Sequence, residues 1–370
     1  MIIRFLTQDD IISHDKVSSQ AFCSSCNVGD PESVLPGEKV LGAFDDDNRT
    51  LFADFEINER KCYYDGEILT CAAIGGVAAK PEHRGKGAVT ALFEYLFNKT
   101  CYDISILYPF SEEYYRRLGY ERAGFCVNAE VPFAELSKIK RNQDAVIYEG
   151  ENPERLLEIY NKCARRYRLC FVRDNTVAFS DKPYYSQKYT YIWKNSAYAI
   201  VRVDRDRSTV FVSEIYFDSL ESMLGILGFL RNFESNQTKV CFQKLPENTP
   251  LFHVIRDIKK CDIRMYDTGA VRILNVEKVL KAHRYPASDS AFTMRIGDDL
   301  FCVAVKGGKA DVKKDPSAVP DVTMDISTAS GVLLSGADGA AYRPGLVIHN
   351  QQSDFFKLFP PKVPFFTDEF

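Results

Sequence analysis

The residues whose types and spacing most clearly suit a chemical role form a short basic turn that contains two glycines, Arg84-Gly85-Lys86-Gly87. An apolar run of small residues, 71–79, precedes the turn, and a segment rich in Ala, Leu and Phe, 88–97, follows it, which predicts a strand, a turn and a helix. The first amides of such a helix have no partners within it, and with the positive end of the helix dipole they attract phosphate. Glycines let the main chain approach the anion closely, and the two basic side chains add charge. The turn therefore predicts a binding site for a ligand that carries a pyrophosphate.

The spacing of the turn excludes two common phosphate-binding fingerprints. The Rossmann turn needs three glycines as G-x-G-x-x-G, but Thr90 stands at the third position, and the Walker sequence G-x-x-x-x-G-K-[ST] is absent. The residues resemble the acetyl-CoA loop of the GNAT acyltransferases, [RQ]-x-x-G-x-[GA], with Arg84 and Gly87 in place and Val89 at the last position. A bulky apolar residue there is typical of one GNAT branch, the enhanced intracellular survival (Eis) family. The alternative is a plain basic turn of an α/β protein.

This resemblance implies acetyl-CoA as the co-substrate and suggests which residues contact it. The backbone of Val77 and Ala79 would bind the pantetheine arm in the manner of a strand, and the amides from Gly85 to Thr90 would hold the pyrophosphate. The implied contact residues are Val77, Ala78, Ala79, Arg84, Gly85, Lys86, Gly87, Ala88, Val89 and Thr90.

A second motif, Tyr114-Tyr115-Arg116-Arg117-Leu118-Gly119-Tyr120, resembles the F-Y-x-x-x-G-[FY] segment that closes many GNAT cores. Tyr115 falls on the tyrosine that those enzymes use as general acid. A phenol with a pKa of about 10 is a proton donor at neutral pH, so it can protonate the CoA thiolate that leaves when an amine attacks the thioester. Tyr114 is the neighbouring competitor, and packing in a core is the alternative role for Tyr115. By the same resemblance Ser111 and Glu112 lie beside the thioester arm, and they can also cap the following helix.

The general base is not evident from either motif, because the only histidine near them, His83, belongs to the turn. The chain ends in Asp368-Glu369-Phe370. Eis-family chains likewise end in Phe after an acidic residue, and their terminal carboxylate serves as base. We therefore expect the α-carboxylate of Phe370 to be the base, with Asp368 and Glu369 helping to form an acidic pocket for a cationic amine.

The composition favours a globular protein without a nucleic-acid or anionic-membrane partner, because the net charge is −4 over 370 residues. No apolar run reaches 18 residues, and acidic residues occur early, which predicts neither a membrane span nor a signal peptide. The 11 cysteines are odd in number and scattered, as expected of free thiols in a reducing cytoplasm. Cys23 and Cys26 form a C-x-x-C, but it lacks the second pair that a zinc site needs, so we expect neither a metal site nor a redox pair there.

The order of strand-like and helical segments predicts a mixed α/β (α+β) fold with two GNAT-like domains in tandem. Residues 1–135 read as β-α-β-β-β-α-β-α-β, the order of a GNAT domain, with Asp65-Gly66 as a type I′ hairpin turn and 120–131 as the last strand. Residues 136–284 repeat the theme without the acetyl-CoA loop. Within them Glu214 lies in the middle of a predicted strand, where a buried, paired structural acid is expected.

Residues 285–370 change in character and resemble the sterol-carrier-protein-like domain at the end of Eis-family chains. Their predicted elements are strands followed by a helix over 327–334, with Ser327 as its expected N-cap. Taken together, these resemblances imply a cytoplasmic, homo-oligomeric N-acetyltransferase, hexameric by the same resemblance, that acts on an aminoglycoside-like or polyamine-like amine.

A carrier of lipids or other hydrophobic ligands, with a vestigial acetyltransferase part, is the competing class. Apolar side chains of the last domain could line a tunnel, although they are also ordinary core residues: Phe355, Phe356, Phe359, Phe365 and Phe366. The intact loop Arg84–Gly87 argues against this alternative, because a vestigial site need not retain it.

Overall fold

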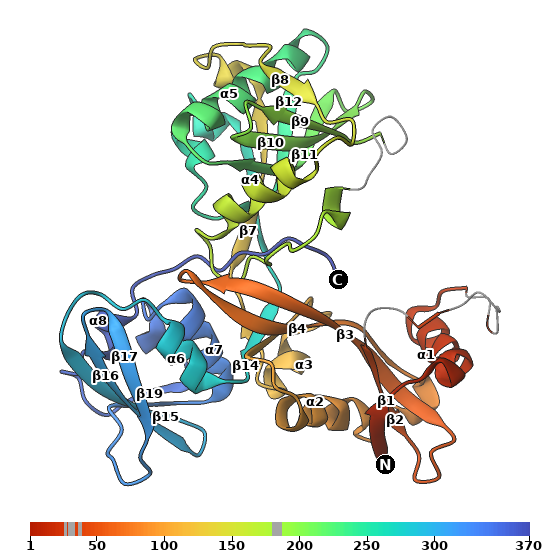
Figure 1. Ribbon diagram of the computed structural model, residues 1–370, viewed down its shortest axis with the longest axis vertical. Coiled ribbons are helices and arrows are strands. Elements are labelled where there is room, and N and C mark those ends of the chain that lie inside the picture. Colours follow the sequence, from red (N-terminus) through yellow and green to blue (C-terminus); the bar gives the residue numbers. More distant parts are fainter. Residues whose placement is uncertain (26–27, 29–33, 36–38, 180–186) are drawn as a thin grey trace.

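The computed structural model describes residues 1–25, 28, 34–35, 39–179 and 187–370, and in them the chain forms three β-sheets with helices packed against them (Figure 1). Each sheet belongs to a separate lobe, and the C-terminus lies in the middle of the molecule, between the lobes. This placement brings the end of the chain to a region where residues from more than one lobe can contribute to a single site.

The first sheet has the strand order β1-β2-β3-β4-β5-β14-β6. Its strands are β1 (Ile2–Phe5), β2 (Lys39–Phe44), β3 (Leu51–Tyr64), β4 (Glu67–Ala79), β5 (Ile104–Leu107), β6 (Glu121–Arg122) and β14 (Ala270–Ile273). The helices are α1 (Ile11–Phe22), α2 (Ala88–Lys99) and α3 (Glu112–Arg117). The predicted hairpin turn between β3 and β4 is confirmed, because Asp65 and Gly66 have φ values of 52° and 98°, as a type I′ turn requires.

The second sheet has the order β13-β7-β12-β11-β10-β9-β8. Its strands are β7 (Phe125–Pro132), β8 (Ala145–Ile147), β9 (Tyr189–Trp193), β10 (Ala197–Asp204), β11 (Thr209–Phe217), β12 (Lys239–Pro246) and β13 (Asp262–Asp267). The helices α4 (Glu154–Ala164) and α5 (Leu220–Leu230) pack against it. As in the first sheet, one pair of neighbouring strands, β11 and β12, is parallel.

The two sheets exchange strands, and here the sequence-based prediction is wrong. The segment 120–131 was expected to close the first sheet, but it breaks after β6, and β7 pairs with β12 and β13 in the second sheet. In return β14 enters the first sheet between β5 and β6. Figure 1 shows β7 rising into the second lobe. Strand-forming residues specify an extended conformation but not the partner strand, so the exchange was not visible in the sequence.

The third sheet, with the order β17-β16-β15-β18-β19, belongs to the C-terminal domain. Its strands are β15 (Ser290–Ile296), β16 (Asp299–Lys306), β17 (Lys309–Lys314), β18 (Val322–Met324) and β19 (Leu346–Ile348). The helices are α6 (Val276–Ala282), α7 (Ile326–Ser335) and α8 (Phe355–Leu358). The expected N-cap of α7 is wrong: Asp325 caps the helix by accepting from the Thr328 amide, whereas Ser327 donates to the carbonyl of Tyr120.

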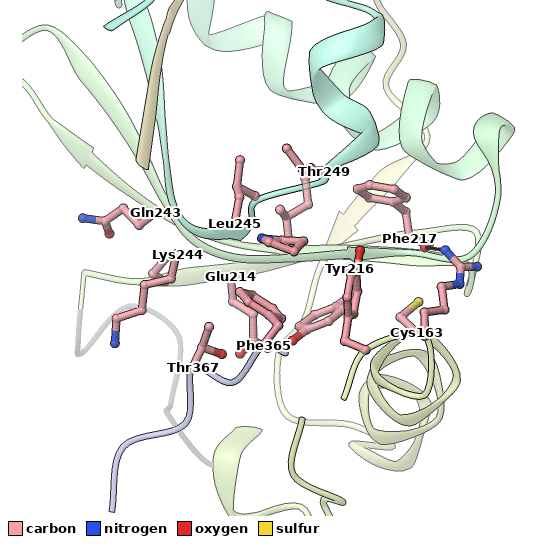
Figure 2. A pocket seen from close by; sticks show the side chains of 15 residues that line it. Cys163, Glu214, Tyr216, Phe217, Gln243, Lys244, Leu245, Thr249, Phe365 and Thr367 are labelled. Atoms are coloured by element: carbon pink, nitrogen blue, oxygen red, sulfur yellow. Dashed lines mark hydrogen bonds between the residues drawn. The ribbon is translucent and has the colours of Figure 1, made fainter. Parts of the chain in front are cut away.

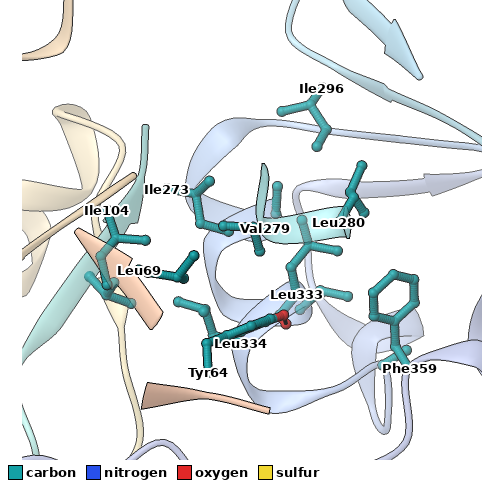
Figure 3. Packing of buried hydrophobic residues seen from close by; sticks show 14 of the residues in the cluster. Tyr64, Leu69, Ile104, Ile273, Val279, Leu280, Ile296, Leu333, Leu334 and Phe359 are labelled. Atoms are coloured by element: carbon teal, nitrogen blue, oxygen red, sulfur yellow. Dashed lines mark hydrogen bonds between the residues drawn. The ribbon is translucent and has the colours of Figure 1, made fainter. Parts of the chain in front are cut away.

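One hydrophobic core joins the C-terminal domain to the first sheet. Figure 3 shows Tyr64, Leu69 and Ile104 of the first sheet facing Leu333 and Leu334 of α7 within this cluster. The Tyr64 hydroxyl donates to the Leu333 carbonyl at 2.8 Å. The third domain is therefore packed against one face of the first sheet.

The phenylalanines that could have lined a lipid tunnel are side chains of packed cores. Phe355 and Phe359 are buried, lie 5.1 Å apart between ring centroids, and both contact Phe292 at 5.6 Å. Phe365 and Phe366 are also buried, while Phe356 is partly buried against the same core. Close-packed rings fill the space that a tunnel would need, so this observation does not favour the carrier alternative.

A buried polar cluster ties the three domains together beneath the hairpin turn. Arg168 donates to the carboxylate of Asp65 and, at 2.9 Å, to the carbonyl of Leu333. Its Nη2 lies 2.8 Å from Nδ1 of His283, whose Nε2 lies 3.0 Å from the Leu358 carbonyl. Burial and the neighbouring guanidinium lower the pKa of His283 to about 4, so this ring is neutral and both of its nitrogens are engaged.

The remaining sequence-based expectations concern cysteines, metals and membranes. The ten cysteines in the described part of the chain are free, and Cys26 of the C-x-x-C lies outside the described residues. No cluster of potential metal ligands is found among the described residues. Within the same ranges, no helix has the length and apolar character needed to cross a membrane.

Candidate active site

The basic turn connects β4 to α2 through a single 3-10 turn, Pro81–His83. Gly85 and Gly87 have φ values of 75° and 79°, a left-handed conformation that side chains with a Cβ rarely adopt. Gly87 is the N-cap of α2, and no side chain of the described residues caps this end. The first amides of the helix are therefore available to an anion.

A cavity of about 750 Å³ opens beside this turn. It is lined by Ala21, Phe22, Val77, Ala78, Ala79, His83, Arg84, Gly85, Gly87, Ala88, Val89, Thr90, Phe110 and Tyr114. Of the ten implied acetyl-CoA contacts, only Lys86 is not in its wall. The Lys86 amine lies 3.0 Å from Nδ1 of His83 and 5.5 Å from the ring centre of Phe52.

The strands around the cavity diverge where a pantetheine arm would need room. β4 and β5 pair in parallel from Cys71 and Ile104 to Ile74 and Leu107, and the ladder ends there. From Gly75 to Ala79, β4 keeps its other neighbour, β3, but on the β5 side it pairs with no strand among the described residues. Unpaired backbone groups in a cavity wall suit a ligand that pairs like a strand. Together with the open amides of α2, this arrangement fits acetyl-CoA.

The structure separates the two candidate tyrosines. Tyr114 lines the cavity, whereas Tyr115 lies behind it, only 2% exposed, with its ring 5.2 Å from that of Tyr114. Phe93 and Phe110 contact the ring of Tyr115 edge-on at 6.0 and 5.4 Å. No hydrogen bond from its hydroxyl to another described residue is seen, and burial raises the pKa of both tyrosines. Tyr115 is therefore a protonated phenol with a free donor.

Ser111 and Glu112 lie at the start of α3, outside the wall of the cavity. Ser111 caps the helix, because its hydroxyl accepts from the Tyr114 amide at 3.3 Å. Both carboxylate oxygens of Glu112 accept from Arg122, at 2.9 and 2.8 Å. This pairing lowers the pKa of Glu112, although partial burial opposes it. Capping and ion pairing account for both side chains.

The C-terminal residue lies against β4, directly before the segment that borders the cavity. A Cβ added to Gly75 would stand 3.2 Å from the backbone oxygen of Phe370. The Phe370 ring stacks on Tyr108 with 5.2 Å between centroids and a 22° interplanar angle, and meets Phe171 edge-on at 5.8 Å. The end of the chain is thus held by aromatic contacts, and its carboxylate faces a glycine that leaves room for it.

Two side chains near the terminus were not found by sequence reasoning. Asn58 on β3 is buried, its Nδ2 has no hydrogen-bond partner in the described part of the chain, and it lies within 4 Å of the same Gly75 position as the Phe370 oxygen. Arg173 contacts both Asp368 and Glu214. The expectation that Glu214 is paired is confirmed, but its side chain is 15% exposed and only half-buried. Neither Asn58 nor Arg173 lies in a motif, and only the fold brings them to the terminus.

A second cavity, of about 720 Å³, borders the same end of the chain. Its wall contains Glu59, Arg60, Lys61, Thr70, Tyr102, Phe171, Val172, Arg173, Asp174, Asn175, Val177, Ala178, Asp368 and Glu369. Both cavities thus include residues of β4 in their walls, and the second one also includes the C-terminal residues Asp368 and Glu369.

The comparisons with known proteins agree with this geometry. Residues 3–123 match the family model described as an acetyltransferase (GNAT) domain. This part of the chain is a GNAT acetyltransferase domain. No curated protein sequence matches the chain.

Solved structures match over the full length of the chain, at identities that establish the fold alone. A GCN5-related N-acetyltransferase from Anabaena variabilis is 21% identical, with a TM-score of 0.83 and 100% of both chains covered. Eis1 from Mycobacterium abscessus is 18% identical, with a TM-score of 0.80 and 100% of both chains covered. A probable N-acyltransferase from Enterococcus faecalis is 16% identical, with a TM-score of 0.83 and coverage of 100% of this chain and 99% of that one. The chain therefore has an Eis-like mixed α+β fold with three sheets.

Proposed function

We propose that the protein is an acetyl-CoA-dependent N-acetyltransferase that acetylates small-molecule amines. The observation that carries this proposal is the position of the Phe370 carboxylate beside Gly75, next to Val77–Ala79, which border the GNAT cavity and do not pair with β5. Two residues of a strand span about 7 Å. A carboxylate at this distance along β4 is well placed to accept a proton from an amine that approaches the acetyl group.

In the proposed mechanism each proton transfer is assigned to one residue. Bound acetyl-CoA supplies the activated acetyl thioester. The Phe370 carboxylate removes a proton from the acceptor amine, and the Tyr115 hydroxyl protonates the departing thiolate. Burial keeps Tyr115 protonated at neutral pH. Glu112 is a poor alternative base, because Arg122 occupies both of its oxygens and stabilises the charged form.

The acceptor is proposed to enter through the second cavity. Its wall carries four carboxylates and three cationic side chains, and the small excess of negative charge suits a cationic amine. The carboxylates belong to Glu59, Asp174, Asp368 and Glu369, and the cations to Arg60, Lys61 and Arg173. The resemblance to Eis-family enzymes suggests an aminoglycoside-like or polyamine-like amine and a hexameric assembly. Sedimentation of the purified protein tests the assembly independently of the chemistry.

A thiol-release assay with acetyl-CoA and a panel of mono- and polyamines tests the activity. Two tagged forms then test the base. A C-terminal extension replaces the carboxylate with an amide and should abolish turnover while acetyl-CoA binding is retained, whereas the same tag at the N-terminus should be harmless. Full activity of the C-terminally extended protein would reject the terminal carboxylate as base.

A further inference from the structure

The last residues of the chain form an extended tail, 359–370, that is fixed to all three domains. Near its start the Lys362 amide donates to the Ser335 carbonyl at 2.9 Å, which ties the tail to α7. Further on, the amide of Phe365 donates to the carbonyl of Arg168 at 2.7 Å, which ties it to the second domain. Phe366 then contacts Tyr108 after β5, at 5.6 Å. The tail therefore reaches the first domain along a path defined by the other two.

The tail lies where two parallel strands of the second domain, β11 and β12, separate, as β4 and β5 separate beside the acetyl-CoA loop of the first domain. β11 and β12 pair in parallel only as far as Val212 and Phe242, just as β4 and β5 separate after four residue pairs. A small cavity of about 40 Å³ remains at this divergence. Figure 2 shows Phe365 and Thr367 of the tail beside Glu214 of β11 and Lys244 of β12. In the second domain the tail thus occupies the place that corresponds to the cavity of the first.

A nearly buried arginine connects the tail to this divergence. Arg173 binds Asp368 through two hydrogen bonds, 2.6 Å from Nη2 and 3.2 Å from Nε. It also binds both oxygens of Glu214, at 3.0 and 2.7 Å. Its side chain is 9% exposed, and its guanidinium lies 3.7 Å from the ring centre of Tyr160. Burial alone would lower the pKa of Arg173, but the carboxylates reverse this and raise it, so the cation is firmly retained.

The geometry points to Arg173, acting through Asp368, as the positioning residue for the Phe370 carboxylate. This inference rests on the proposed function, in which that carboxylate is the base. Chain ends normally fray, and only two residues, about 7 Å of extended chain, separate the clamped Asp368 from the terminus. The planar guanidinium fixes the carboxylate of Asp368 in two directions, because bidentate pairing restrains orientation as well as distance. The tail then binds where β11 and β12 of the second domain separate, and this contact holds the proposed base of the first domain in place. The second domain itself lacks an acetyl-CoA loop.

The decisive variant is Asp368→Ala, with Asp368→Asn as its milder form. Both leave the Arg173–Glu214 pair intact, so the buried arginine keeps a counter-ion and the protein should fold. A catalytic group displaced by about 1 Å can lose about 10² in rate. We expect kcat at saturating amine to fall at least 30-fold for Asp368→Ala, with the Kd for acetyl-CoA unchanged. The matched control is Asp354→Ala, which removes another acid–base pair, with Lys357, at an exposed place away from both cavities and should keep full activity.

Two further measurements separate positioning from other roles of Asp368. If Asp368 only attracted the cationic amine, its loss would raise KM and leave kcat unchanged, which would overturn the inference. Carboxypeptidase A, which removes C-terminal aromatic residues, should release Phe370 at least tenfold faster from Asp368→Ala than from the wild type or the Asp354→Ala control. Equal release rates would also overturn it.

A chain that lacks Phe370 distinguishes this inference from the proposed function. If the shortened chain keeps its turnover, the terminal carboxylate is not the base, and both ideas are rejected. If the shortened chain is inactive while Asp368→Ala retains its kcat, the base stands and the clamp is rejected. Loss of kcat in both, with faster release of Phe370 from Asp368→Ala, supports the clamp.

Discussion

Gly75 offers a way to displace the proposed base without touching the tail that carries it. A Cβ at this position would stand 3.2 Å from the Phe370 oxygen and 3.5 Å from its terminal carbon. The glycine does not have a positive φ, so an alanine fits the backbone of the strand. The two atoms nearest to the added Cβ belong to the end of the chain, and the next is Nδ2 of Asn58, at an ordinary contact distance of 3.7 Å.

The size of the effect follows from these distances. The distance of 3.2 Å between the added Cβ and the Phe370 oxygen is shorter than an ordinary van der Waals contact, so Gly75→Ala should push the terminus away by a few tenths of an ångström. If about 1 Å costs about 10² in rate, this shift should lower kcat roughly three- to tenfold, and the methyl groups of Gly75→Val should lower it by about 10² or more. Alanine in a strand should at the same time raise the free energy of unfolding by about 0.5 kcal/mol, because it loses less backbone entropy than glycine. Activity and stability are thus expected to change in opposite directions.

Steady-state kinetics with thiol detection and thermal melts measure the two quantities on the same preparations. The internal control is the same substitution in a chain that lacks Phe370, where Gly75→Ala should have no further effect on turnover, as a double-mutant cycle requires for coupled groups. An unchanged kcat in Gly75→Val, or an equal loss in the shortened chain, would refute the placement of the base beside β4.

Three further predictions address the cavity, the acid and the pH dependence of stability. Gly87→Val should weaken acetyl-CoA binding at least tenfold, about 1.4 kcal/mol. The reason is that a β-branched residue is strained at a φ of 79°. Unchanged affinity by calorimetry would place the pyrophosphate elsewhere. Tyr115→Phe should lower kcat by about 10² to 10⁴ without weakening acetyl-CoA binding, whereas a loss confined to Tyr114→Phe would transfer the role of acid to the tyrosine in the cavity wall. Stability should decrease as the pH falls from 6.5 to about 4, because the unfolded chain protonates His283 in this range and the folded protein does not. Melting curves of His283→Asn should show a flatter profile over the same interval, and a profile as steep as that of the wild type would assign the pH dependence to other groups.

The sequence was informative where local chemistry determines the structure. The hairpin at Asp65-Gly66 and the helix after Gly87 follow from short-range backbone preferences, and both are found as predicted. The cap of α7 was misplaced by two residues, because Asp325 and Ser327 are both good caps and the hydroxyl of Ser327 has a tertiary partner in Tyr120. Local signals alone cannot choose between equivalent caps.

The environment of the C-terminal residue was beyond such reasoning. The resemblance implied a base at Phe370, but Asn58, Tyr108 and Arg173 come from three separate segments and carry no spacing signal. Their meeting depends on how the domains are docked. The same limitation explains the misassignment of β7, whose residues are suitable for either sheet.

The exchange of β7 and β14 between the two sheets also affects folding during synthesis and the solubility of expressed fragments. On the ribosome, the strand that completes the first sheet, β14, is synthesised only after the whole of the second domain. Until then β5 and β6 lack the strand that pairs with both, and unpaired strand edges promote aggregation. An expression fragment that stops near residue 135 should therefore be insoluble unless a peptide equivalent to Ala270–Ile273 is supplied or fused to it. Engineering of a minimal acetyltransferase from this chain will need a circularly rearranged gene rather than a simple truncation.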